Sequence, residues 1–190
     1  MKILINASNL TKGGGVQVAL SFINELLFID NDTIFIIVVS EEIHEQLNLK
    51  KFSFKKFKII KLNLYKGFKA VFLNSKLLSN IEKELKPSRV FTVFGPIAWR
   101  PKAKHLVGFA IPHIVYTELP YMQKLNFNSK LIQKIRNSIK MFFLRRSADQ
   151  VVTETSDVSN RLFNLLNKKT PVHTVANCLN ETYLHKEIII

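Results

Sequence analysis

Two kinds of hydrophobic pattern alternate along this chain. Short apolar runs rich in β-branched residues predict buried strands, and segments with an apolar residue at every third or fourth position predict helices. The predicted buried strands cover residues 2–8, 33–40, 89–95, 105–111, 149–156 and 171–180. An alternating run at residues 57–64 predicts an edge or half-exposed strand. The predicted helices cover residues 16–27, 41–47, 69–86, 129–148 and 158–169, with Ser156 or Asp157 as the N-cap of the last one.

This alternation of strands and helices predicts the fold class. Buried strands covered by helices are typical of an α/β, Rossmann-like, doubly wound and mostly parallel sheet. The 190 residues provide one substantial core, and the 47 % hydrophobic content with a mean hydropathy of +0.08 fits a packed globular chain.

Three of the six glycines are consecutive, in the stretch NASNLTKGGGVQVALSFINELL (residues 6–27). Gly13 to Gly15 separate the first predicted strand from a helix that starts near Val16, so we expect a loop at the carboxyl edge of the sheet, where open α/β sheets bind ligands. Glycine permits positive φ and close approach to a ligand, and a helix N-terminus favours an anion. The loop therefore predicts a site for an anion or a polyhydroxyl group, with a plain structural turn as the alternative.

Two familiar phosphate motifs are excluded at this loop. A P-loop would end in Gly-Lys-Ser/Thr, which is absent, and the dinucleotide fingerprint would place its third glycine where Val18 stands. A single cysteine, Cys178, excludes an intrachain disulfide and a cysteine-built metal site, and no histidine pair has metal-ligand spacing. We expect no metal and no bound cofactor.

The net charge of +14 is concentrated in two stretches without acids, residues 46–81 and 119–148. A basic surface attracts nucleic acid, anionic lipid or a phosphorylated small molecule, although a compositional bias toward Lys explains part of it. The N-terminus enters a strand pattern directly and no apolar run approaches the ~18 residues of a spanning helix. We therefore expect no signal peptide and a cytoplasmic location, with the inner face of the membrane as a candidate site of attachment.

The predicted helix at residues 129–148 carries an apolar stripe and a basic remainder. The stripe consists of Ile132, Ile135, Ile139, Phe142 and Phe143, and the basic residues are Lys130, Lys134, Arg136, Lys140, Arg145 and Arg146. Such a helix can lie on an anionic membrane with its basic residues facing the headgroups. The simpler interpretation of the stripe is that it packs on the sheet.

Several stretches together resemble the N-terminal domain of retaining GT-B glycosyltransferases of the family 4 type. Residues 1–27 resemble the first strand, glycine-rich loop and helix of that domain, residues 94–116 resemble its middle strands, and residues 149–180 resemble its closing elements. The resemblance implies an acceptor-binding Rossmann-like domain at residues 1–175 and a linker from residue 176 to 190 toward a C-terminal domain that binds the nucleotide sugar.

The resemblance also implies roles for particular residues. Gly13, Gly14 and Gly15 would leave room for sugar and phosphate, with Lys12 at the rim of the site and Val16 at the helix start. His113, which follows a buried strand, would meet the transferred sugar and act as the catalytic residue, with a satisfied loop histidine as the alternative.

Four further residues are candidates for substrate binding from their chemistry. Trp99 would stack on a sugar or lipid headgroup unless it is a buried anchor of its loop, and Arg100 would bind phosphate. Tyr116 and Glu118 follow His113, and Glu118 is a candidate base, although a solvated carboxylate is the simpler interpretation.

The family's donor half carries two glutamates eight residues apart, and no two glutamates of this chain have that spacing. We therefore expect a glycosyltransferase half that is inactive alone and that, once complete, moves a sugar from a nucleotide-sugar donor to a surface-glycan or lipid-linked acceptor with retention. A basic nucleic-acid-binding module and a non-catalytic binding or scaffold protein of the same fold are the alternatives. No recognition motif supports the first of these, so we expect no nucleic-acid partner.

Overall fold

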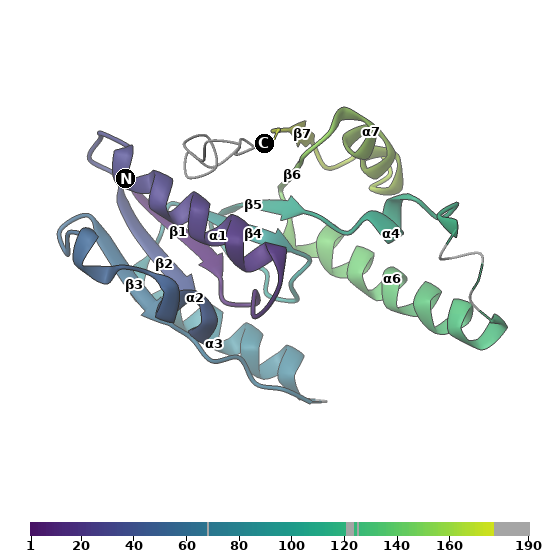
Figure 1. Ribbon diagram of the computed structural model, residues 1–190, viewed down its shortest axis with the longest axis horizontal. Helices are drawn as coiled ribbons and strands as arrows, with labels where there is room; N and C mark the ends of the chain where they lie inside the picture. The colour runs from purple at the N-terminus through teal and green to yellow at the C-terminus, as the bar shows by residue number, and fades with distance from the viewer. Residues whose placement is uncertain (68, 121–123, 125, 177–190) are drawn as a thin grey trace, which may run out of the picture.

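The computed structural model describes residues 1–67, 69–120, 124 and 126–176. Its centre is a seven-stranded sheet in the order β3-β2-β1-β4-β5-β6-β7, and every neighbouring pair of strands is parallel (Figure 1). The strands are β1 (Lys2–Ala7), β2 (Ile34–Val39), β3 (Phe57–Lys61), β4 (Arg89–Gly95), β5 (Lys104–Phe109), β6 (Gln150–Thr153) and β7 (Val172–Thr174). The predicted Rossmann-like α/β class is confirmed, as is the edge position of the strand that starts at Phe57.

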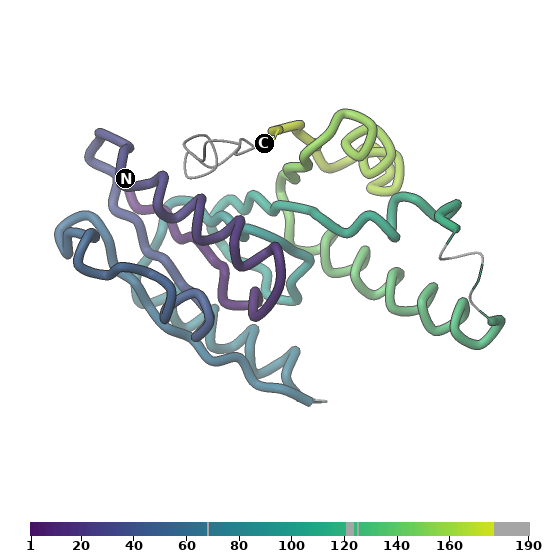
Figure 2. Tube along the Cα trace, viewed as in Figure 1, coloured from purple at the N-terminus to yellow at the C-terminus, as the bar shows by residue number. Residues whose placement is uncertain are grey.

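Helices cover the sheet on both faces. They are α1 (Gly14–Glu25), α2 (Glu41–Gln46), α3 (Ala70–Leu85), α4 (Pro112–Val115), α6 (Phe127–Ser147) and α7 (Ser156–Leu165), with short 3-10 segments at Leu26–Phe28 and Leu49–Lys51. The chain builds β1, β2 and β3 outward to one side, and α3 then returns it to β4 on the other side of β1 (Figure 2). Strand order therefore reverses between β1 and β4, and in open α/β sheets ligands bind at such a switch point.

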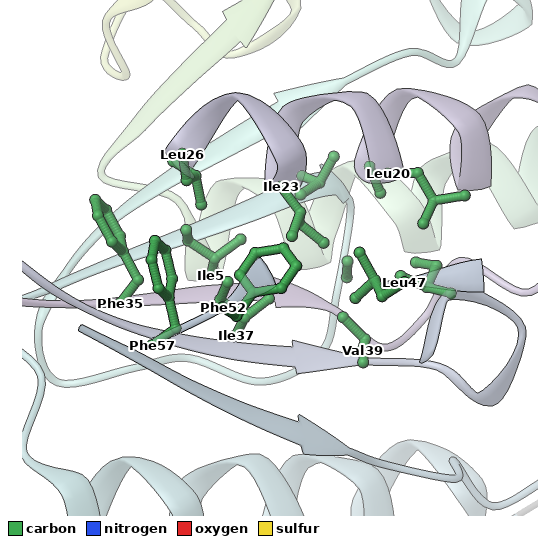
Figure 3. Close-up of a cluster of buried hydrophobic side chains, with 14 of the residues drawn as sticks. Ile5, Leu20, Ile23, Leu26, Phe35, Ile37, Val39, Leu47, Phe52 and Phe57 are labelled. Atoms are coloured by element: carbon green, nitrogen blue, oxygen red, sulfur yellow. The ribbon is translucent and has the colours of Figure 1, made fainter. Parts of the chain in front are cut away.

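Successive residues of β1 face opposite layers of the core. Ile5 belongs to the cluster under α1 and α2, with Ile23 of α1 and Ile37 of β2 (Figure 3). Leu4 belongs to the cluster on the other face, with Leu78 of α3. This alternation follows from the two-residue period of a strand, and it explains why both faces of β1 and β2 carry buried apolar side chains.

The second half of the sheet has its own cluster under α4, α6 and α7. Val107 of β5 packs there with Leu144 of α6 and Leu162 of α7, and each of these side chains is fully buried. Val90 of β4 pairs with His105 of β5, so these two residues point to the same face of the sheet, which is the α3 face. Val107 lies two residues after His105 and therefore points to that face as well. Only α1 and α2 lie on the opposite face among the helices that the structure describes.

Several element boundaries differ from the prediction, and three of them change the assignment of residues. Helix α1 begins at Gly14, two residues before the first apolar position, so Gly14 and Gly15 belong to its first turn and not to a loop. Thr155, and not Ser156 or Asp157, caps α7, because its Oγ1 accepts the Val158 N–H at 3.3 Å. The last strand is confined to Val172–Thr174; residues 177–190, with Cys178 and most of the expected linker, lie outside the described residues.

The apolar stripe of α6 does not pack on the sheet, so the simpler interpretation of this helix was wrong. Its buried residues are Met141, Leu144 and Ser147. Four residues of the stripe, Ile132, Ile135, Ile139 and Phe142, are about half exposed, and Phe143 is half-buried. Asn126 caps the helix through a 2.9 Å bond from the Ser129 N–H. The described part of the chain contains no helix that is long and apolar enough to cross a membrane.

Candidate functional site

Polar side chains cluster at the carboxyl end of β1, at the switch point. Asn6 is fully buried, and its Oδ1 accepts hydrogen bonds from the backbone N (3.2 Å) and the hydroxyl (2.7 Å) of Ser8. Asn9 donates from Nδ2 to the carbonyl oxygen of Phe94, at the end of β4, over 2.8 Å. These partners fix both amide orientations, because a backbone N–H only donates and a carbonyl only accepts.

A cavity of about 170 Å³ lies beside these residues, between the end of β1, the start of α3 and the segment that follows β4. Three polar atoms of its lining residues are buried and have no hydrogen-bond partner within the described residues: Asn6 Nδ2, Asn9 Oδ1 and Trp99 Nε1. Each unpaired buried group costs about 1–3 kcal/mol, so three such groups on residues that line one cavity favour a ligand that pairs with them. Two donors and one acceptor suit hydroxyl groups, which both accept and donate.

The glycine segment lies at the same edge of the sheet. Gly13 is the N-cap of α1 with φ 71° and ψ −161°, a conformation that is essentially restricted to glycine. A Cβ on Gly13 or Gly14 would meet nothing within 4 Å, and one on Gly15 would touch Leu10 and Phe94 at 3.4 and 3.6 Å. The backbone conformation therefore requires glycine only at Gly13, and the space above Gly14 is open to a ligand.

Lys12 and Val16 flank this segment in different ways. Lys12 is exposed, in agreement with a position at the rim. Val16 is 3 % exposed within the α1 cluster, and its N–H donates to the Gly13 carbonyl at 3.1 Å. Because its side chain packs in the core and its N–H is used inside the turn, Val16 is a core residue here, which corrects its assignment to substrate binding.

Trp99 is buried, whereas the next residue, Arg100, is exposed. Trp99 is 2 % exposed and packs with Leu4 and Leu78, so its ring is covered and cannot stack on a sugar. The anchoring alternative describes the ring, and the indole N–H is buried without a hydrogen-bond partner among the described residues. Arg100 is exposed, outside that cavity.

His113 lies on α4, directly after β5, at the expected edge of the sheet. Burial lowers the pKa of His113 below its ordinary value of 6.5, and the nearby ammonium of Lys140 lowers it further. A hydrogen bond with the Asn137 side chain raises this pKa, but by less. Its Nε2 is buried without a hydrogen-bond partner among the described residues. A neutral imidazole at pH 7 is suited to hydrogen bonding and not to carrying charge. Strands β1 and β5 are two positions apart, so their ends are separated by about 10 Å.

Tyr116 and Glu118 are held by α7. The Tyr116 hydroxyl donates to Asp157 over 2.7 Å, and the Arg161 guanidinium lies 4.8 Å from the Tyr116 ring centroid. Arg161 also forms an ion pair with Glu118 at 2.7 Å. The pKa of Glu118 is held below its ordinary value by a backbone hydrogen bond first and by Arg161 as well. This arrangement anchors the segment after α4, and the role of Glu118 as a base stays a prediction.

Two other kinds of site were considered, a metal site and a second cavity. No group of three His, Cys, Asp or Glu side chains in the described ranges could hold a metal ion. A wider cavity, of about 550 Å³, lies at the amino ends of β4, β5 and β6, with Arg89, Lys104 and Asp149 in its wall. That edge is opposite the switch-point edge, where Rossmann-like sheets bind their ligands.

The structure brings Gly13, Gly14 and Gly15 to the edge that Asn6 and Asn9 also occupy, and Trp99 lines the cavity at that edge. It does not bring His113, Tyr116 or Glu118 into contact with them. Asn6 and Asn9 were not among the residues predicted from the sequence to bind substrate. Both lie at or just after the carboxyl end of the first predicted strand, and polar residues at that position indicate the edge of the sheet where ligands bind.

Comparison with known proteins agrees with this arrangement at the level of the fold. No protein-family model and no curated protein matches the chain. Among solved structures, it is similar to Arabidopsis thaliana UGT89C1 complexed with UDP-L-rhamnose, with 13 % identity, a TM-score of 0.56, and 98 % of this chain and 56 % of that chain covered. The complex of UGT89C1 with quercetin gives 11 % identity, a TM-score of 0.58 and coverage of 94 % and 50 %.

A UGT transferase from Siraitia grosvenorii in complex with UDP gives 10 % identity, a TM-score of 0.53 and coverage of 98 % and 54 %. The chain thus spans about half the length of these structural neighbours. What is shared is the fold: the chain has the Rossmann-like parallel α/β sheet found in GT-B glycosyltransferase domains.

Proposed function

We propose that this chain is the acceptor-side domain of a GT-B glycosyltransferase that uses a nucleotide-sugar donor. The cavity at the switch point binds a hydroxyl-rich acceptor, and the glycine segment leaves space for the sugar and diphosphate that come from a donor-binding half. The chain alone does not transfer sugar, because it supplies one side of the site.

The observation that carries this proposal is that three residues lining one cavity each carry an unpaired buried polar atom. Asn6 and Trp99 supply N–H donors, and Asn9 supplies a carbonyl acceptor. A volume of about 170 Å³ has room for about five water-sized groups, which suits part of a sugar ring with its hydroxyls. The wall also contains apolar side chains, among them Leu78 and Ile97, which suit the C–H faces of a sugar.

Structural neighbours support the other half of the proposal. UGT89C1 has been solved with UDP-L-rhamnose, with UDP and with quercetin, so one protein of this fold binds both a nucleotide sugar and quercetin. Because the present chain spans only about half of such proteins, the donor side is assigned to a further domain.

The finer features come from the sequence resemblance. A family 4 type enzyme would transfer the sugar with retention, to a surface-glycan or lipid-linked acceptor in the cytoplasm. In that scheme His113, as a neutral imidazole, donates a hydrogen bond to a hydroxyl of the transferred sugar and positions it. Lys12 and Arg100 contribute positive charge at the rim.

The single tryptophan allows a direct test, because its indole N–H gives one resolved side-chain signal in a heteronuclear NMR spectrum. Isotope-labelled protein is titrated separately with glucose, galactose, mannose, N-acetylglucosamine and UDP. We expect at least one sugar to shift the Trp99 indole and the Asn6 and Asn9 amides. UDP leaves these signals unchanged, because its site lies in the other half.

Two variants sharpen this test. Asn9→Ala removes the hydrogen-bond acceptor Oδ1 and weakens the sugar-induced shift of the Trp99 signal. Asn160→Ala, which changes an exposed asparagine on α7, leaves that shift unchanged. Absence of a shift at Trp99 with every sugar would refute the acceptor site. Tight, salt-dependent binding of mixed single-stranded RNA with shifts elsewhere would favour the nucleic-acid alternative.

A further inference from the structure

Helix α6 presents an apolar face to solvent, and we propose that this face docks on an anionic lipid bilayer. Five large side chains make the face, each about half exposed: Leu131 (49 %), Ile132 (50 %), Ile135 (52 %), Ile139 (50 %) and Phe142 (55 %). At about 100° per residue, all of them lie within about 60° of Ile135 around the helix axis. The face is therefore one continuous stripe, on the side of α6 opposite to the buried Leu144.

Positive charges border this stripe on both sides. Lys134 and Arg136 are exposed and lie about 100° to either side of Ile135, and Arg146 continues the stripe at its C-terminal end. The helix contains no acidic residue. An apolar centre with basic flanks matches a bilayer surface, where acyl chains lie beneath anionic headgroups.

The structure narrows the set of basic residues that the sequence assigned to the membrane. Lys140 is half-buried beside His113, and Arg145 donates to the Leu165 carbonyl over 2.6 Å. Lys130 lies about 140° from Ile135, on the far side of the helix. Lys134, Arg136 and Arg146 are thus the residues that face the headgroups.

Charge complementarity distinguishes a bilayer from the other candidate occupants. A second copy of the chain would set the basic flanks of one α6 against those of the other, with no acid on either helix. Nucleic acid would use the charges but would leave five aliphatic and aromatic side chains in water. Anionic lipid satisfies both features at once.

The placement of α6 connects this surface with the site, a step that rests on the proposed function. The helix returns the chain from the carboxyl end of β5 to the amino end of β6, so its N-terminal half extends beyond the sheet on the ligand-binding edge (Figure 1). A helix lying on the bilayer holds that edge near the headgroups, where a lipid-linked acceptor would be presented.

Vesicle sedimentation tests the proposal without reference to sugar transfer. The chain is mixed with vesicles of phosphatidylcholine alone or with phosphatidylglycerol added, and we expect binding only to the anionic vesicles. Lys134→Gln with Arg136→Gln weakens binding by about 30-fold, at ~1 kcal/mol per charge. Ile135→Ser with Ile139→Ser weakens it by roughly tenfold or more, also at low salt.

Matched controls lie on the opposite end of the sheet. Lys55→Gln with Lys58→Gln removes two exposed charges near the β3 edge, and Phe54→Ser removes a fully exposed aromatic ring. Both leave binding within about threefold, because neither touches α6. Circular dichroism and the emission of the buried Trp99 check that every variant is folded.

A second measurement locates the helix in the bilayer. Brominated lipids quench the emission of the Ile139→Trp variant but not that of the wild type, whose single Trp99 is buried. Equal losses in the α6 variants and the controls would overturn the proposal. So would a dimer that the Ile135 and Ile139 substitutions dissociate while vesicles are not bound, or binding of RNA in place of vesicles.

Discussion

Substitution of the consecutive glycines separates what the backbone needs from what a ligand needs. Gly13→Ala places a Cβ at φ 71° and ψ −161°, which L-residues rarely adopt and which costs about 1–3 kcal/mol of unfolding free energy. Gly14→Ala places a Cβ in open space at a helical position, where alanine stabilises by about 0.4–1 kcal/mol. For a chain of this size the midpoint of thermal unfolding falls by about 2–12 °C in the first variant and rises by about 1–4 °C in the second.

The emission of the single buried Trp99 follows unfolding in urea or on heating, and both variants are compared with wild type at matched concentration. Equal destabilisation by Gly13→Ala and Gly14→Ala would refute the start of α1 at Gly14. A Gly14→Ala protein that is less stable than wild type would contradict the open space above Gly14.

Two further predictions concern groups away from the glycine segment. Burial lowers the pKa of His105 below 6.5, so as pH falls below about 7 the unfolded chain takes up a proton before the folded one does. Stability to urea therefore decreases toward pH 5, by up to about 1.4 kcal/mol per pH unit, and less steeply in His105→Gln; an identical slope in the variant would contradict this assignment. Arg161→Ala removes the ion pair with Glu118 and the contact with Tyr116, so backbone amides at residues 116–118 exchange hydrogen faster by mass spectrometry while global unfolding is unchanged. Unchanged exchange there would show that α7 does not anchor this segment.

Most of the fold was predictable because its signals are local. Six-residue apolar runs such as Ile34–Val39 have few alternatives to a buried strand, and parallel pairing follows once helices separate them. Element ends were less predictable. Gly14 and Gly15 look like loop residues by propensity, yet they form the first turn of α1, since packing of Val16 and Ile23 in the core outweighs the weak helix preference of two glycines.

The candidate site was predictable in place but not in composition. The carboxyl edge of β1 follows from strand order, and the glycines lie there as expected. Which polar atoms lack partners depends on contacts between distant segments. Asn9 donates a hydrogen bond to the carbonyl of Phe94, which lies 85 positions away in the sequence. The Trp99 ring is buried because Leu4 and Leu78, from β1 and α3, pack with it. No local pattern contains that information.

The sequence by itself determined the α/β alternation, the parallel sheet and the basic, apolar character of α6, because hydrophobic periodicity and charge are properties of neighbouring residues. The tertiary structure alone decided which face of α6 the rest of the chain leaves uncovered, that the Trp99 side chain is buried, and which residues with unpaired polar atoms line one cavity. These outcomes depend on how segments far apart in the chain pack together, and packing is decided only when the whole core has formed.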